Sequence, residues 1–244
     1  FLIQYLVGRS MKELGLETMR RMLSGSSLTS QEILPYAQEL EKYGANRTSL
    51  TTTMKAEYMT IANEISGVEI VRLFDSTWYL KLLAKSPYHF KRNETKLLFA
   101  EEFRSVINNL EQEYYSQTQK SEPFFFYPES ILKIIITSNS IGRDLFGTLI
   151  FDPDLAVQVA LEDFAVRGTQ TMLALKAYYR DNGFLPATLE ALAPNYLDSN
   201  PRDPFDGNAL RFSASERVIY SIGENLQETT EDKNREGGTA FRFE

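Results

Sequence analysis

Oxygen-bearing side chains gather near the end of the chain, in the polar segment from Glu224 to Gly238. Glu224, Asn225, Glu228 and Asp232 offer carboxylate and amide oxygens, which are the ligands that hard cations such as Ca²⁺ prefer. Their spacing does not follow the EF-hand loop, which needs acidic residues at its first and third positions and a glutamate at its twelfth. We therefore expect these four residues to be the candidate calcium ligands, and a plain solvated loop is the alternative.

The chain has one histidine, His89, in the segment SPYHFKRN. A histidine can act as a general base, but the sequence contains neither G-x-S-x-G nor H-E-x-x-H, and no phosphate-binding loop that ends in Gly-Lys-Ser/Thr. We expect His89 to be a surface or packing residue. No catalytic residue and no organic cofactor site is assigned from the sequence.

Neighbouring carboxylates are common, for example Glu101 with Glu102 and Glu111 with Glu113. Residues one or two positions apart do not face each other on a helix, so this spacing is typical of a solvated surface. Hydrolysis by two carboxylates requires only a suitable separation in space. A carboxylate-dependent hydrolase is therefore the enzymatic alternative.

Composition limits the possible partners of this protein. The 244 residues are 43% hydrophobic and 24% charged, as in ordinary globular proteins. The net charge of −7, without a cluster of Lys or Arg, argues against nucleic-acid binding, which needs a basic surface. The chain has no cysteine, which excludes disulfides and thiolate metal sites.

The segment FLIQYLV at residues 1–7 is far shorter than the roughly 20 apolar residues that span a bilayer. We interpret it as the beginning of an amphipathic helix. The alternative is that a signal or membrane anchor was removed just upstream.

Capping signals and apolar spacing divide the first two-thirds of the chain into helices. Thr29 and Glu32 form a capping-box pattern, and helical spacing continues from there to Gly44. We expect further helices over residues 48–66 and 68–84. The segment ILKIIIT, residues 131–137, fits either a strand or a helix, and the helical spacing of Leu132, Ile135 and Ile136 favours a helix. Asn93 is the expected N-cap of another long helix. Its apolar stripe consists of Phe99, Phe103, Val106, Leu110 and Tyr114.

Asp152-Pro153-Asp154 is a strong helix start, and it predicts a helix of about 27 residues that ends at Asn182-Gly183. Gly168 on its apolar face would let another backbone approach closely. The apolar face consists of Val157, Leu161, Phe164, Gly168, Met172, Leu175 and Tyr179. The charged surface of the same helix consists of Glu162, Asp163, Arg167 and Lys176.

The sequence after Pro194 predicts strands. We expect strands over residues 209–213, 217–222 and 239–243, which form a small antiparallel sheet on the long helix. Asp203 and Asp206 flank Pro204-Phe205, and we expect their side chains to bond their own backbone and hold a turn.

The C-terminal third of the chain resembles a known family. LALKAYYRDNGFLPATLEALAPNYLDSNPRDPFDGNALRF, followed by VIYSIGEN, is similar to the C-terminal region of uncharacterised bacterial envelope proteins. It also resembles the globular part of the major pseudopilins of type II secretion. The resemblance implies a long helix followed by a small sheet, and calcium in the final loop, here Glu224 to Gly238. Pseudopilins carry their long helix at the extreme N-terminus, whereas about 150 residues precede it here, so we do not expect a filament subunit.

Together these observations predict an α+β, predominantly helical fold, with a helical region over residues 1–150 and a long helix plus small antiparallel sheet over 151–244. We expect the two regions to pack as one body. The expected function is that of a non-enzymatic, periplasmic or envelope-associated bacterial protein that acts through protein contacts. The alternatives are a hydrolase with its site between the helices and the sheet, and a calcium-stabilised binding module.

Overall fold

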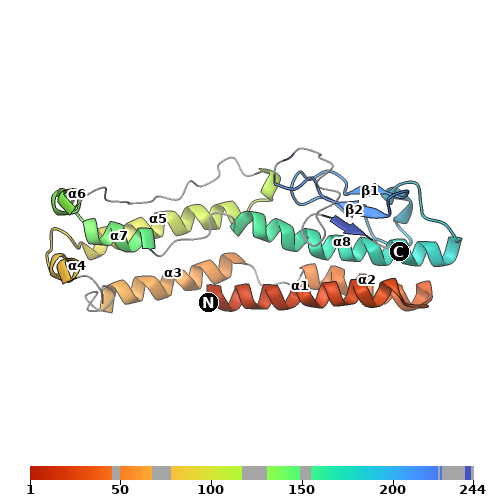
Figure 1. The fold of residues 1–244 in the computed structure, drawn as a ribbon, viewed down its shortest axis with the longest axis horizontal. Coiled ribbons are helices and arrows are strands. Elements are labelled where there is room, and N and C mark those ends of the chain that lie inside the picture. Colours follow the sequence, from red (N-terminus) through yellow and green to blue (C-terminus); the bar gives the residue numbers. More distant parts are fainter. Residues whose placement is uncertain are drawn as a thin grey trace. The chain divides into compact units, whose positions relative to one another are not determined.

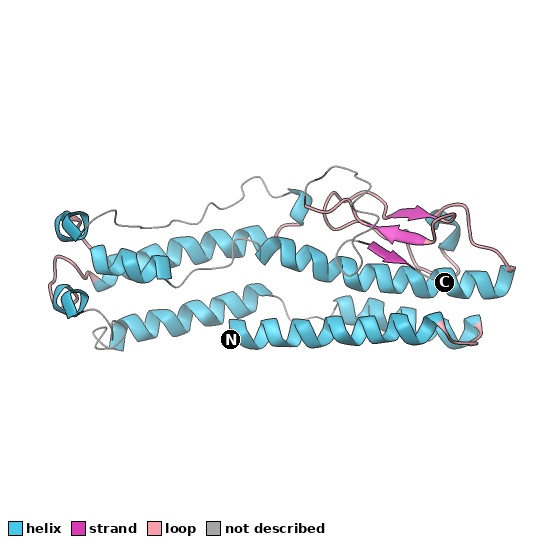
Figure 2. Cartoon of the chain, in the orientation of Figure 1, coloured by secondary structure: helices cyan, strands magenta, loops and turns pink. Residues whose placement is uncertain are grey.

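The computed structural model describes residues 1–45, 50–67, 78–116, 131–148, 155–224, 226 and 240–242. Over these residues the fold is α+β and predominantly helical, with a long helix followed by a small antiparallel sheet (Figures 1 and 2). The predicted fold class is therefore confirmed. In the part of the chain that the structure describes, no helix has both the length and the apolar character needed to cross a membrane.

The helical elements are α1 (Leu2–Ser24), α2 (Ser30–Ala45), α3 (Leu50–Gly67), α4 (Trp78–Leu83), α5 (Arg92–Leu110), η2 (Tyr114–Ser116), α6 (Ile131–Ile136), α7 (Ser140–Thr148), α8 (Leu155–Asn182) and η3 (Leu189–Leu192). The strands are β1 (Arg211–Ser213), β2 (Val218–Tyr220) and β3 (Ala240–Arg242). The η elements are single turns of 3₁₀-helix.

The described elements form two compact units. Unit 1 contains α3 to α7, and unit 2 contains α1, α2, η2, α8, η3 and the three strands. The boundary expected from the sequence lay near residue 150, whereas here residues of α1 and α2 share a hydrophobic core with α8. An apolar stripe shows that a helix needs a partner, but not which partner it takes.

Unit 1 is a helical core around α5. Phe99 and Phe103 are 1% and 2% exposed, and they contact Phe146 of α7 and Tyr58 of α3 at ring-centroid distances of 5.1 and 5.5 Å. The predicted stripe is therefore buried as far as Val106. The predicted N-cap is wrong: α5 begins at Arg92, so Asn93 lies inside the helix, and Lys91 at the N-cap position makes no side-chain capping hydrogen bond. The predicted stripe also ended too late, because Tyr114 lies in η2 of unit 2.

Unit 2 is arranged around α8, with the sheet on one side and α1 and α2 on the other (Figure 1). The strand order is β1-β2-β3, and the register pairs Phe212 with Ile219 and Ile219 with Phe241. Paired residues share a face of the sheet, and this face joins the core that contains Phe164 of α8. The sheet predicted from the sequence is confirmed.

The capping box before α2 is confirmed in part. The carboxylate of Glu32 accepts the backbone N–H of Thr29 at 2.8 Å, as the pattern predicts. The Thr29 hydroxyl donates to the same carboxylate, also at 2.8 Å, instead of accepting a backbone N–H. These two bonds hold the pKa of Glu32 below its usual value.

Helix α8 is buried on more than the single predicted face. Phe164 and Leu175 of that face are fully buried, but Ala174 and Ala177 on other sides are fully buried too. Glu162, expected on a charged surface, is only 4% exposed. It accepts hydrogen bonds from the Tyr5 hydroxyl at 3.0 Å and from Lys12 of α1. The prediction of an exposed Glu162 is therefore wrong, because α1 covers that side of α8.

Gly168 lets another group approach α8 closely, as predicted, but that group is an aromatic ring and not a backbone. A Cβ at this position would lie 2.6 Å from two carbons of the Phe241 side chain. The Phe241 ring also stacks on Phe164 at a centroid distance of 4.9 Å. Gly168 therefore allows β3 to dock on α8.

Candidate functional site

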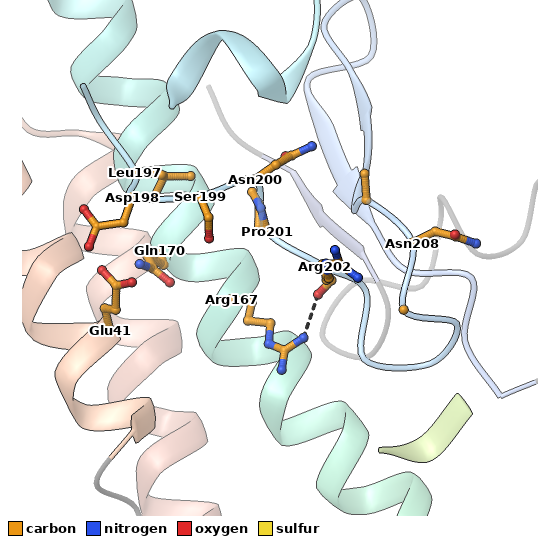
Figure 3. Close-up of a pocket in the computed structure, with 12 residues that line it drawn as sticks. Glu41, Arg167, Gln170, Leu197, Asp198, Ser199, Asn200, Pro201, Arg202 and Asn208 are labelled. Atoms are coloured by element: carbon orange, nitrogen blue, oxygen red, sulfur yellow. Dashed lines mark hydrogen bonds between the residues drawn. The ribbon is translucent and has the colours of Figure 1, made fainter. Parts of the chain in front are cut away.

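A groove of about 770 Å³ lies beside α8 in unit 2. Its lining comes from three places: Glu41 of α2, Arg167 and Gln170 of α8, and the segment that leads from η3 to β1 (Figure 3). That segment contributes Leu197, Asp198, Ser199, Asn200, Pro201, Arg202, Gly207, Asn208 and Ala209. We call this hollow the α8 groove.

Charges of both signs line the α8 groove. Glu41 and Asp198 lie on one side of it, and Arg167 and Arg202 lie on the other (Figure 3). Between them, Gln170 supplies an amide that can both donate and accept hydrogen bonds. This arrangement suits a ligand that itself carries separated positive and negative groups.

Arg167 joins α8 to the far wall of the groove. Its Nη1 donates to the backbone carbonyl of Arg202 at 2.9 Å (Figure 3). This bond uses one of the five N–H donors of a guanidinium. The group can therefore support the wall and still present donors toward a carboxylate.

Behind the wall, Asp203 ties three parts of the chain together. Its side chain is fully buried and accepts four hydrogen bonds, from the N–H of Phe205 at 2.9 Å, the Ser221 hydroxyl at 2.8 Å, the N–H of Ile222 at 2.9 Å and Arg211 at 2.6 Å. The predicted turn bond is the first of these. The other three connect the turn to β1 and to the end of β2, which sequence reasoning did not anticipate.

Asp206 holds the tip of the same turn. It accepts the N–H of Asn208 at 3.0 Å, as predicted, and pairs with Arg211. Partial burial alone would raise the pKa of Asp206, but the bonds from Arg211 and Asn208 outweigh it, so the pKa is lowered. Gly207 follows with a φ of 74°, a left-handed conformation that favours glycine. The turn is thus a rigid frame for Asn208 and Ala209 of the groove.

The structure describes one of the four candidate calcium ligands. Glu224 is exposed and directly follows Gly223, while Asn225, Glu228 and Asp232 lie outside the described residues. Among the residues that are described, no group of three or more His, Asp or Glu side chains is placed to hold a metal ion. The calcium site stays a prediction.

His89 lies in unit 1 and is 9% exposed. Its Nδ1 is 3.0 Å from the hydroxyl of Ser140, and its ring packs edge-on against Tyr88 at 5.0 Å. The side chain of Ser140 is fully buried. Of the two roles expected for His89, surface residue or packing residue, its burial supports packing.

Two carboxylates of unit 1 have raised pKa values. Burial raises the pKa of Glu102 in α5 and of Asp144 in α7, and these two helices pack against each other. Perturbed acids can mark catalytic sites. Neither residue lines the α8 groove, so these acids and the groove are separate features.

Comparison with known proteins does not add to this geometry. No family model, no curated protein and no solved structure matches the chain.

Proposed function

We propose that this chain is a non-enzymatic protein of the bacterial cell envelope that acts through protein contacts, and that the α8 groove receives a polar segment of the partner. The groove carries this proposal. Eight of its twelve lining residues are polar or charged, and they include two arginines and two acids. Small-molecule pockets are mostly apolar with a few polar groups, so this lining suits a peptide better.

The rigidity of one wall supports the same function. Asp203, Asp206 and Arg211 fix the turn that carries Asn208, so the wall is formed before a partner arrives. Such preorganisation reduces the ordering cost of binding. The envelope location is proposed from the resemblance of the C-terminal third to bacterial envelope proteins and pseudopilins.

A peptide-display selection against the full chain tests the groove. We expect the selected peptides to carry both acidic and basic residues and to lose affinity at least tenfold for Arg167→Glu and for Glu41→Lys. The control is Glu39→Lys, which makes the same charge change on α2 at a 71% exposed side chain that does not line the groove. Peptides that bind all three variants equally would exclude the groove as the contact site.

The envelope location needs its own test. Fractionation of cells that express the natural full-length protein should recover it with the envelope or periplasmic fraction. Recovery in the cytosolic fraction would contradict the location, while the peptide experiment would still decide the role of the groove.

A further inference from the structure

Two short helices of unit 1 expose large apolar side chains. Trp78 and Leu82 of α4 are 76% and 64% exposed. Leu132, Ile135 and Ile136 of α6 are 67%, 48% and 64% exposed. Residues three and four apart lie on the same side of a helix, so each helix presents its apolar side chains together. Single exposed apolar residues are ordinary, but five of them within two six-residue helices are typical of a contact surface.

Hydrogen bonds connect these two helices at one end of unit 1 (Figure 1). The Tyr88 hydroxyl, in the turn after α4, donates to the backbone carbonyl of Ile136 at 2.9 Å. The N–H groups of Asn139 and Ile141 donate to the carbonyls of Tyr88 and His89 at 2.8 and 2.9 Å, which holds the same turn to the start of α7. The exposed side chains therefore belong to one surface. We call it the α4–α6 end, formed by Trp78, Leu82, Tyr88, Leu132, Ile135 and Ile136.

The charge around the α4–α6 end is opposite to that of the whole chain. Residues 78–93 and 131–143 contain six Lys or Arg residues and no Asp or Glu, although the net charge of the chain is −7. Lys85, Arg92 and Lys133 among them are exposed. The sign stays positive when the preceding residues 68–77 and 117–130 are also counted, with eight basic and four acidic residues in all. This end therefore attracts a negatively charged partner that the chain as a whole would repel.

We propose that the α4–α6 end docks on an anionic lipid surface, with its apolar side chains below the headgroups and its basic side chains among them. Such a surface offers an apolar layer directly under a layer of negative charge, and Trp and aliphatic residues beside Lys and Arg are the combination that binds it. Trp favours the boundary between membrane and water. A lysine can lie along apolar surface with its stem and still reach the headgroups with its ammonium group. All residues of the α8 groove belong to unit 2, so this inference is independent of the groove.

The composition of the α4–α6 end favours lipid over an acidic protein. A protein interface combines fitted pockets with directional hydrogen bonds, whereas a lipid surface adapts to protruding side chains and requires only apolar contact and charge. The polar group on the six side chains of this end is the Tyr88 hydroxyl, and it already bonds to Ile136. The surface thus offers apolar contact and positive charge, which are the two features that an anionic lipid surface recognises.

Trp78 is the only tryptophan of the chain, so its fluorescence reports on this end without a label. In the free chain we expect acrylamide to quench its emission. Vesicles of phosphatidylcholine mixed with anionic phosphatidylglycerol should shift the emission to shorter wavelengths, and bromine-labelled acyl chains should quench it. Neutral phosphatidylcholine vesicles should bind at least tenfold more weakly, and added salt should weaken binding to the anionic vesicles. A Trp78 that acrylamide does not reach in the free chain would overturn the proposal, because this end would then already be covered.

Two double variants separate apolar contact from charge. Leu132→Ser with Ile136→Ser removes exposed apolar side chains, and Lys85→Glu with Lys133→Glu reverses exposed charges. Each should lower the affinity for the anionic vesicles at least tenfold. The melting temperatures should stay close to that of the wild type, since all four side chains are exposed. Unchanged affinity in both variants would overturn the proposal.

The matched controls make the same changes elsewhere on the chain. Met11→Ser with Met22→Ser changes side chains of α1 that are 71% and 72% exposed. Lys42→Glu with Lys55→Glu changes side chains that are 68% and 60% exposed. Both controls should bind the anionic vesicles within a factor of about three of the wild type. Losses as large as those of the α4–α6 variants would overturn the proposal, because the site of docking would not be this end.

A soluble peptide of alternating Glu and Phe represents an acidic protein as the competing occupant. The peptide should leave the Trp78 emission of the free chain unchanged, and the anionic vesicles should still shift it when the peptide is in excess. A shift with the peptide and none with the vesicles would overturn the proposal in favour of a protein partner.

Discussion

The guanidinium of Arg211 lies 2.6 Å from Oδ2 of Asp203, a carboxylate with no exposed surface. The same guanidinium pairs with Asp206, so one basic group of β1 holds both acids of the preceding turn. Because the Asp203 side chain also bonds Ser221 and the N–H of Ile222, this pair connects the wall of the α8 groove to the sheet.

Removing Asp203 should strongly destabilise unit 2. Asp203→Ala leaves Arg211 without its buried partner and breaks the bonds to Phe205, Ser221 and Ile222. Loss of one member of a buried ion pair costs about 3–5 kcal/mol. Asp206→Ala should cost about 1 kcal/mol, since Asp206 is partly exposed. Urea unfolding measures both values, and equal losses would contradict the central role of Asp203.

Gly168→Ala should destabilise the protein although alanine is the better helix former by about 1 kcal/mol. The added Cβ would lie 2.6 Å from the Phe241 ring, and such overpacking typically costs about 1–3 kcal/mol. Combining it with Phe241→Leu should recover part of the loss. Gly8→Ala, in open space, is the control and should stabilise the protein. Thermal melting at low concentration compares the variants, and a more stable Gly168→Ala protein would contradict this packing.

The pair formed by Lys12 and Glu162 should show strong coupling. Glu162 is 4% exposed and Lys12 is 15% exposed, so either charge left alone would be poorly solvated. Lys12→Met should cost about 3 kcal/mol. The double variant Lys12→Met with Glu162→Gln should cost clearly less than the sum of the single changes. A double-mutant cycle by urea unfolding measures the coupling, and additive losses would exclude it.

Asp206 and Glu102 should affect acid stability in opposite directions. The pKa of Asp206 is lowered in the folded state. The ionised Asp206 side chain therefore contributes its full stabilisation above the unfolded-state pKa of about 3.9. This stabilisation is lost as the pH falls through the folded-state pKa. The pKa of Glu102 is raised by burial, so its ionisation costs stability as the pH rises through the folded pKa.

Two neutral variants separate these effects. Asp206→Asn should lose stability relative to the wild type at pH 7 and approach it at low pH. Glu102→Gln should gain stability relative to the wild type as the pH rises from about 4 to about 7. Thermal melting across this range provides the measurement, and identical pH profiles for the two variants would contradict the assigned shifts.

The predicted calcium ligands can be tested by melting the protein with calcium and with a chelator. A ligand at 100 times its dissociation constant adds about 2.7 kcal/mol to the free energy of unfolding. The gain should disappear when Glu228 and Asp232 are changed to Gln and Asn. A melting temperature that is the same with calcium and with chelator would remove the proposed site.

The sequence by itself determined the local elements. The capping pair Thr29 and Glu32, the stripe through Phe99 and Phe103, and the turn acids Asp203 and Asp206 all depend on neighbours within a few residues. Such short-range bonds and spacings can be recognised without the fold. For the same reason the fold class and the presence of a small antiparallel sheet after the long helix followed from the sequence.

Only the tertiary structure decided which surfaces meet. The sequence assigned Glu162 to a charged surface, but α1 covers it and supplies Lys12 as its partner. The α8 groove joins Glu41 to Arg167 and Arg202, which no local pattern relates. The exposure of Met11 likewise follows from the side of α1 that faces α8. Periodicity identifies the apolar side of a helix, but the partner for each side depends on packing between residues far apart in the chain.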